Sequence, residues 1–449
     1  MFLKRTDTTT LSMPLKSSKK KTAREHEEGG GRVGSSISIK RSAVREFLNA
    51  HMDTFRNRWR LRSILGSGSY GTVYRAERKD DASRKAVVKV FRIQSNAKTQ
   101  VVTDIIFGFV TEVVVQMYAA AVSANICDAI VCMLVDEYGI QKSDSNDGLE
   151  AYIILSDTEP GEPLQTVLDY LSLPPSPIVT TPSVRAISAV QNRPLRIAES
   201  LAKNVQRLHA TVGIAHLDLK PENVLLLDAD PTRTKLIDLG LACIEKSRLA
   251  VAQEHVKHVQ AKLVDRLGGS LGSGSTASVA MDVATALQAF DARKSLTCAV
   301  YQGTPPYHSI VMRVPSGFNQ KTSNKLFAYG RNQDIYALGV MTQELFLGRP
   351  ASGRHPSSSS VDTPTSETIE RVRNSVLFRN RSTKEHMEIA SDYTDALVHM
   401  PQLIFAKDPS RKIYDLTNAM IGLLVRGKPE ITLDEVVKQL AHTVKMMKQ

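Results

Sequence analysis

A glycine-rich turn between two strand-like segments is the feature that most limits how this chain can fold. Residues 66–73 read GSGSYGTV and place Gly66, Gly68 and Gly71 at GxGxxG spacing. Because glycine has no Cβ, it lets backbone N–H groups approach an anion closely. A strand pattern precedes this turn and another comes after it, whereas a dinucleotide-binding βαβ unit needs a helix after the glycines. The pattern therefore predicts either a phosphate-binding loop or an ordinary glycine-rich hairpin.

Strand patterns dominate the chain up to residue 158, and helical patterns dominate the remainder of the chain. We expect five antiparallel strands, with one apolar helix over residues 104–122. Helical periodicity then covers residues 164–171 and 195–210, and it prevails again from residue 332. The sequence therefore predicts an α+β chain with a small β lobe over residues 59–158 and a larger, mainly helical lobe over 159–445.

Polar and low-complexity stretches predict a tail and three flexible inserts. Residues 1–50 are polar, basic and glycine-containing, so we expect a disordered tail before a domain over residues 55–445. Flexible inserts are predicted near residues 172–194, 246–300 and 351–367.

Charge and cysteine content give weaker indications. The net charge is +12, and residues 16–24 hold a basic run that can be an anionic-surface or nuclear-import patch or simply a solvated tail. We find no nucleic-acid-binding module. The four cysteines lack CxxC spacing, so we interpret them as free thiols in a reducing compartment and not as a disulfide or zinc site.

No secretory signal or membrane span is expected. The N-terminal residues lack a continuous apolar core, and residues 107–122, the most apolar stretch, carry Glu112 in their middle. We therefore expect a buried helix there, and a cytoplasmic or nuclear location.

Residues 216–223 (HLDLKPEN) bring a carboxylate, a cation and an amide close together in the sequence. Asp218 can accept the proton of an attacking hydroxyl, and Lys220 can neutralise a phosphoryl group in transfer. Asn223 and Asp238 offer oxygen ligands, and Mg²⁺ prefers few protein oxygens together with phosphates. This set predicts phosphoryl transfer from a bound nucleotide.

Two further charges lie in apolar segments. Lys89 falls in a strand pattern and Glu112 in the apolar helix. Each is costly to bury alone, but paired they can hold a phosphate-facing lysine in place. The alternative is that each is an exposed charge at the edge of its element.

These motifs together resemble the eukaryotic protein kinase family. The resemblance covers roughly residues 59 to 442 in the order GSGSYGTV, VVK, Glu112, HLDLKPEN, DLG, GTPPY and DIYALG. It implies a bilobal protein-kinase-like fold and transfer of the γ-phosphate of ATP, with Mg²⁺, to a protein hydroxyl. The KPEN sequence resembles serine/threonine kinases rather than tyrosine kinases.

The resemblance also implies site residues. Asp334 should anchor the catalytic loop, and Thr304 should lie beside Asp218. The residues expected to contact ATP are Gly66, Ser67, Gly68, Ser69, Tyr70, Gly71, Val73, Val87, Lys89, Leu155, Ser156, Thr158, Glu162 and Leu225.

The sequence departs from the family at several positions. Leu217 stands where the family has the arginine that receives an activation-loop phosphate, and Leu239 replaces the phenylalanine of DFG. Ile310 and Val311 replace a Pro–Glu pair, and Glu430 stands where that glutamate's arginine partner is expected, although Arg411 is a rival for it. A kinase-fold scaffold without activity and a small-molecule kinase are therefore the alternatives to a protein kinase.

Overall fold

The computed structural model describes residues 55–68, 71–122, 134–143, 148–156, 160–172, 181–270, 275–298, 304, 307, 323–348, 411–422 and 431–446. All of them belong to one compact unit, Thr54–Gln449. The basic tail, the predicted insert at 351–367, Ile310, Val311 and Glu430 lie outside the described residues.

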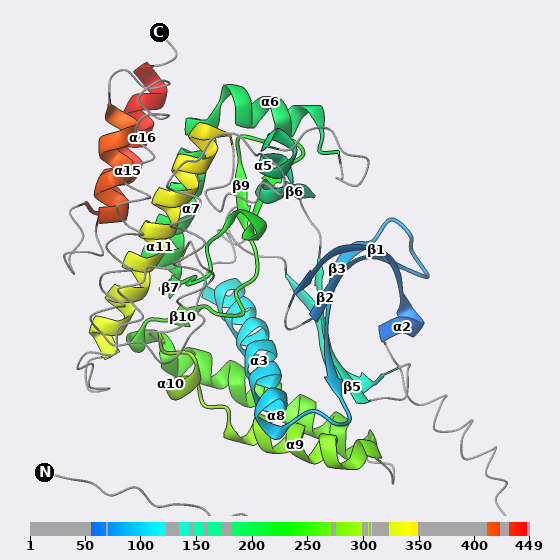
Figure 1. Cartoon of the computed structure of the whole chain (residues 1–449). Helices are drawn as coiled ribbons and strands as arrows, with labels where there is room; N and C mark the ends of the chain where they lie inside the picture. The colour runs from blue at the N-terminus through cyan, green and yellow to red at the C-terminus, as the bar shows by residue number, and fades with distance from the viewer. Residues whose placement is uncertain are drawn as a thin grey trace, which may run out of the picture. The chain divides into compact units, whose positions relative to one another are not determined.

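A five-stranded antiparallel sheet forms the small lobe (Figure 1). Its strands run in the order β1-β2-β3-β5-β4, and a short helix, α2 (Phe55–Arg58), precedes them. The strands are β1 (Trp59–Gly68), β2 (Gly71–Arg78), β3 (Lys85–Gln94), β4 (Val135–Lys142) and β5 (Gly148–Ser156). The predicted strand number and direction are confirmed.

Alternation along β3 gives the sheet two different faces. Val87 and Phe91 point into the main core, whereas Val88 and Val90 belong to a separate cluster that also contains Trp59. Since side chains alternate along a strand, Lys89 lies on the same face as Val87 and Phe91. This is the face that the long helix α3 (Thr99–Val122) covers.

Helix α3 is the buried apolar helix that the sequence predicts. Its length and apolarity match a membrane span, but 67% of its most apolar window is buried inside the protein. The described residues contain no other helix that meets the same criteria.

The larger lobe is mainly helical, as predicted, and carries two small sheets. One sheet has the order β6-β8-β9, and the other pairs β10 with β7. Its strands are β6 (Gly161–Pro163), β7 (Ile214–Ala215), β8 (Val224–Leu227), β9 (Thr234–Leu236) and β10 (Cys243–Ile244).

The described helices and helical turns of this lobe include α7 and α11, which lie in contact with each other. They are α5 (Leu164–Ser172), α6 (Val184–Asn192), α7 (Pro194–Arg207), the π-helical turn η1 (Leu208–Val212), α8 (Leu249–Ser270), α9 (Ser275–Ala289), α10 (Ala292–Ser295), α11 (Ser323–Leu347), α15 (Lys412–Gly422) and α16 (Leu433–Met446), with short 3-10 turns η2 (Pro221–Asn223) and η3 (Lys246–Arg248).

The prediction of a flexible insert at residues 246–300 is wrong for most of this segment. Helices α8, α9 and α10 occupy it and pack against one another and against α3, β4 and β5. Glycine and serine around residue 270 suggested flexibility, but the valines and leucines on either side form buried helix faces. Likewise, α6 occupies the second half of the predicted insert at 172–194.

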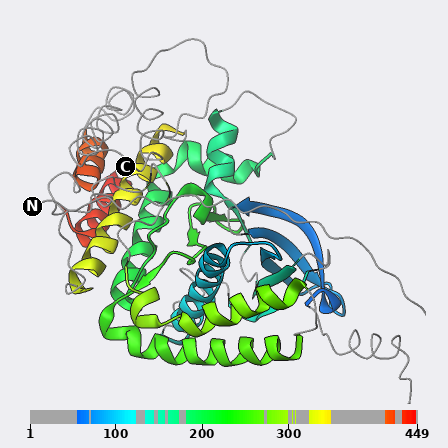
Figure 2. The same ribbon diagram turned by 60° about the horizontal axis from the view of Figure 1, so that its bottom comes forward.

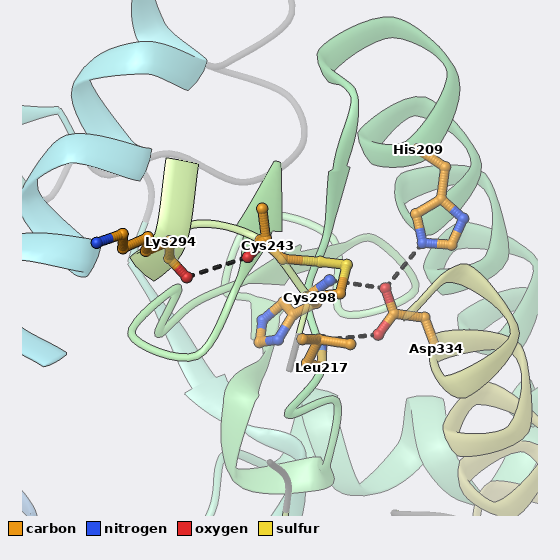
Figure 3. Close-up of a disulfide and its surroundings, with 8 residues drawn as sticks. His209, Leu217, Cys243, Lys294, Cys298 and Asp334 are labelled. Atoms are coloured by element: carbon orange, nitrogen blue, oxygen red, sulfur yellow. Dashed lines mark hydrogen bonds and ion pairs between the residues drawn. A yellow bond between two sulfur atoms is a disulfide. The ribbon is translucent and has the colours of Figure 1, made fainter. Parts of the chain in front are cut away.

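The interpretation of all cysteines as free thiols is also wrong. Cys243 and Cys298 form a disulfide with a Cα–Cα distance of 4.9 Å (Figure 3). They are 55 residues apart in the sequence, so no local spacing indicates the pair. Cys127 and Cys132 lie outside the described residues.

Candidate active site

The predicted ion pair between the strand lysine and the helix glutamate is present. Lys89 Nζ lies 2.7 Å from Glu112 Oε2 and 2.8 Å from Asp238 Oδ1. Strand β3, helix α3 and the segment after β9 each contribute one charge to this cluster. A single lysine therefore connects the small lobe with the DLG sequence of the larger lobe.

Burial and mutual attraction shift the pKa of all three groups. Burial alone would lower the pKa of Lys89, but attraction to Glu112 and Asp238 raises it above its ordinary value. Burial raises the pKa of Asp238, but the neighbouring Lys89 lowers it below the usual range overall. Burial is the dominant influence on Glu112 and raises its pKa to about 7 despite Lys89. Lys89 therefore stays protonated, and Glu112 is the member that titrates near neutral pH.

Asp218 is held from three sides. Thr304 Oγ1 donates to Asp218 Oδ1 at 2.6 Å, and Lys220 Nζ lies 2.9 Å from Asp218 Oδ2. Lys220 also donates to Thr304 at 3.0 Å, and Asn223 Nδ2 donates to the Asp218 backbone carbonyl at 2.8 Å. Asp218 is only 8% exposed, so the orientation of its carboxylate is well fixed. The predicted contact of Thr304 with Asp218 is confirmed.

Asp334 anchors the loop that carries Asp218, as predicted. From α11, its carboxylate accepts the backbone N–H groups of His216 at 2.7 Å and Leu217 at 2.8 Å (Figure 3). Leu217 has a φ of 66°, a left-handed conformation that is rare for a branched, non-glycine residue. These bonds help to maintain that conformation, because strained backbone persists only where its surroundings over-determine it.

The glycine-rich turn joins β1 to β2, where Gly68 pairs with Gly71. A Cβ at Gly71 would collide with the Val90 carbonyl oxygen, so the close approach of β2 to β3 requires glycine here. Ser67 pairs with Thr72, whereas Ser69 and Tyr70 lie outside the described residues.

The residues predicted to contact adenine come from both lobes. Val87 pairs with Leu155 across β3 and β5, and both are buried. Val73 packs against the same core, and Leu225 lies in β8 of the larger lobe. Ser156 ends β5, and Thr158 lies outside the described residues. Their role in binding ATP stays a prediction.

Glu162 has a partner that the sequence did not suggest. Its carboxylate accepts from the backbone N–H of Ser183 at 2.9 Å and from the Ser183 hydroxyl at 2.9 Å. Ser183 in turn caps α6 by accepting from Ala186 N. The structure thus gives Glu162 a role in fixing the start of α6, and a contact with the ribose stays a prediction.

The donors predicted for Mg²⁺ fit a site that depends on phosphate. Asn223 uses its amide nitrogen on Asp218, at 2.8 Å from the backbone carbonyl, which leaves its carbonyl oxygen as the ligand atom. Within the described part of the chain, no cluster of three His, Cys, Asp or Glu side chains could hold a metal by itself. Binding of Mg²⁺ by Asn223, Asp238 and phosphate oxygens stays a prediction.

Sequence reasoning missed two features beside this site. His209, in the π-helical turn η1, bonds to Asp334 Oδ2 through Nε2 at 2.8 Å. The disulfide lies beside Leu217 (Figure 3), and both belong to an apolar cluster with Ala215 and Phe327. Leu217 stands where the family has a phosphate-binding arginine. The replacement of that arginine by leucine was visible in the sequence, but nothing nearby indicated a disulfide.

Helix α11 passes close to this apolar cluster at Gly330. A Cβ there would come within 2.9 Å of Cys298 Sγ and 3.2 Å of Leu217 Cδ2. A glycine is therefore needed for α11 to lie against the disulfide. The other replacement, Leu239, is fully buried in the main core.

Comparison with known proteins found one matching family model, and similarity to known sequences and solved structures. The family model of the protein kinase domain matches residues 59–259. The probable serine/threonine-protein kinase yakA of Dictyostelium discoideum is 52% identical over 40 residues, which are 9% of this chain and 3% of that protein's length. In the solved structure of the CAK complex from Chaetomium thermophilum bound to ATP-γ-S, one chain is similar with a TM-score of 0.42 and 14% identity, over 88% of this chain and 93% of that one.

The family match ends inside α8, so Thr304 and Asp334 are placed by their contacts with Asp218 and its loop and not by that match. The described fold has the small antiparallel lobe and the larger helical lobe that the motifs predict. The resemblance to the protein kinase family is therefore confirmed over residues 59–259, which match the model of its domain.

Proposed function

We propose that this chain is an ATP-dependent serine/threonine protein kinase. The observation that carries the proposal is the enclosed carboxylate of Asp218, bonded to Thr304 at 2.6 Å and to Lys220 at 2.9 Å. Thr304 belongs to the sequence GTPPY, which resembles the peptide-docking region of protein kinases, so this contact links the proposed base to the proposed substrate site. A small-molecule kinase would not need that sequence.

Asp218 accepts the proton of a serine or threonine hydroxyl as its oxygen attacks the γ-phosphorus of ATP. The bond from that phosphorus to the bridging oxygen breaks, and ADP leaves. Lys220 neutralises charge on the transferring group, and Lys89 holds the other phosphates while Glu112 orients it. Asn223 and Asp238 would bind Mg²⁺, which supplies charge neutralisation at the phosphates when bound.

The serine/threonine assignment rests on two narrower observations. Lys220 lies within the KPEN form of the catalytic loop, which resembles that class. The short match to the Dictyostelium protein, a probable serine/threonine-protein kinase, points the same way. The substrate is thus proposed to be a protein with an accessible hydroxyl.

The test is phosphate transfer from labelled ATP with Mg²⁺ to generic acidic and basic proteins and to the chain itself. Asp218→Asn is assayed beside the wild type, and Asp265→Asn, on α8 and away from the site, serves as a matched control. Transfer that disappears only in Asp218→Asn supports the proposal. If neither protein transfers phosphate, Mg-ATP binding is measured next: tight binding would indicate a missing activator or substrate, and no binding would mean that the chain is a kinase-fold scaffold instead.

A further inference from the structure

The middle part of helix α3 is buried on every side. Its buried residues include every position from Phe109 to Gln116, more than two full turns. A helix that is apolar all round needs neighbours on each face. The sheet covers one side, where Phe109 packs edge-on against Phe91 with ring centroids 5.5 Å apart. The opposite side needs another cover.

Helices α8 and α9 supply that cover. Both pack against α3 and lie beside it in the two ribbon views (Figure 1, Figure 2). Phe290, just after α9, meets Phe107 of α3 edge-on with centroids 5.2 Å apart. The buried residues of α8 and α9 share one core with those of α3, namely Val256, Val259, Leu263, Leu267, Val279, Val283 and Leu287.

The same helices also contact the five-stranded sheet. Arg266 of α8 donates to the Tyr152 hydroxyl of β5 at 2.9 Å. Lys262, one turn earlier, lies 4.0 Å from the centre of the Tyr138 ring of β4. Because α8 and α9 contact both α3 and the edge of the sheet, they fix the helix relative to β3 and its Lys89.

The part of the chain that carries α8, α9 and α10 is fixed at both ends beside the catalytic loop. The disulfide joins Cys243 and Cys298 at its base, and Ile244 N donates to the Leu296 carbonyl at 2.8 Å. Strand β10 pairs with β7, which directly precedes His216. The segment therefore links the catalytic loop at one end to α3 at the other.

We infer that helices α8, α9 and α10 form an intramolecular positioning element that holds α3 so that Glu112 meets Lys89. The inference rests on the proposed kinase function and adds how its site is kept assembled. Kinase activity depends on the lysine–glutamate pair being in place. In this chain the pair is held by a segment of the chain's own larger lobe, so no separate protein is required to dock on α3.

Phe290 and Arg266 are the positioning residues to test, because they contact α3 and the sheet respectively. The experiment compares the full-length wild type with a Phe290→Ala/Arg266→Ala double variant. The matched control is Met281→Ala/Lys257→Ala, which changes one exposed residue on each of the same two helices. Amide hydrogen exchange of α3 and of α7 is measured together with kcat and KM for ATP.

We expect amide exchange in α3 of the double variant to be about tenfold faster, while exchange in α7 stays at the wild-type rate. The kcat should fall about 10- to 100-fold, with a smaller change in KM for ATP, because a misplaced Glu112 affects transfer more than nucleotide binding. The control variant should match the wild type in both measurements.

Unchanged exchange in α3 would overturn the inference, and so would an equal acceleration in α3 and α7, which would indicate general destabilisation. The exchange measurement does not require activity. If the wild type transfers no phosphate, the proposed function fails, while the exchange in α3 still decides whether the segment positions this helix.

Discussion

The loop around Asp218 and the segment after β10 lie side by side but relate to the sequence in opposite ways. Asp218, Lys220, Asn223 and Asp238 lie close together in the sequence, and their contacts agree with the chemistry that these residues suggest. Between Cys243 and Cys298, glycine and serine suggested a flexible insert, but the described residues there form helices α8, α9 and α10, and a disulfide joins the two cysteines. Chemistry is encoded locally in this chain, whereas the scaffold that supports it depends on contacts between distant residues.

The largest effect should come from the lysine that joins the two lobes. Lys89→Ala is expected to lower kcat/KM for phosphate transfer about 10²- to 10³-fold, because an electrostatic group aimed at the phosphates is lost. Lys203→Ala is the matched control, since Lys203 forms only a surface pair with Glu199. Steady-state transfer assays measure both. Equal activities would mean that the polar cluster does not perform the chemistry proposed for it.

The second effect concerns the segment between Cys243 and Cys298. Cys243→Ser/Cys298→Ser should lower the free energy of unfolding by about 2 to 4 kcal/mol, because the disulfide no longer restricts the unfolded chain. Urea denaturation of wild type and variant, each with and without a dithiol reductant, measures the effect. The reductant should destabilise only the wild type. If it lowers the midpoint of both proteins equally, the disulfide does not stabilise this region.

The third effect is a pH dependence that originates in Glu112. Burial raises its pKa to about 7, so protonation below that pH removes its attraction to Lys89. The kcat/KM should therefore fall as pH decreases through about 7, by about tenfold per unit for a single group. Glu112→Gln should lose this step and stay at a low rate across it. The same step in both profiles would assign it to a different group.

Glu112 gives the stability of the folded protein a pH dependence opposite in sign to that of its activity. The folded-state pKa of Glu112 lies above the ordinary value of about 4.3 for an exposed glutamate. Its contribution to stability is therefore fully present below that ordinary value and is lost as pH rises through about 7. Loss of activity on mild acidification should accordingly occur without unfolding, which circular dichroism can check.

The smallest effect is expected from removal of phosphate groups, which should leave the activity unchanged. Leu217 is 3% exposed in an apolar cluster, so it offers no charge to a phosphorylated activation segment. Phosphatase treatment should leave the rate of transfer within about twofold of the untreated protein. Complete loss of activity after treatment would show that a phosphate is bound by some other group.

The sequence predicted the fold class well because periodic patterns mark the strands and helices. Alternating and helical patterns gave the five strands, the buried helix and the helical lobe, and Asp334 and Thr304 lie where the family resemblance implied. Neither the disulfide between Cys243 and Cys298 nor the hydrogen bond from Ser183 to Glu162 could be predicted. Each depends on residues that are distant in the sequence, and neither shows a repeating pattern.

The disulfide also weakens the prediction of a reducing compartment. Only the absence of local cysteine motifs supported that prediction, and Cys243 and Cys298 are paired without one. Disulfides persist mainly in oxidising surroundings, so the compartment has to be decided by an observation other than cysteine spacing.

The Cys243–Cys298 bond turns the chain between these residues into a closed covalent ring. A protease that cuts once anywhere inside the ring would leave a single molecule, because the sulfur–sulfur bond still connects the two pieces. The nicked protein would keep its mass apart from one added water, and it would separate into two fragments only after reduction. A cut just outside the ring would divide the chain at once, so the site of cleavage alone would decide whether the catalytic loop and α11 stay linked.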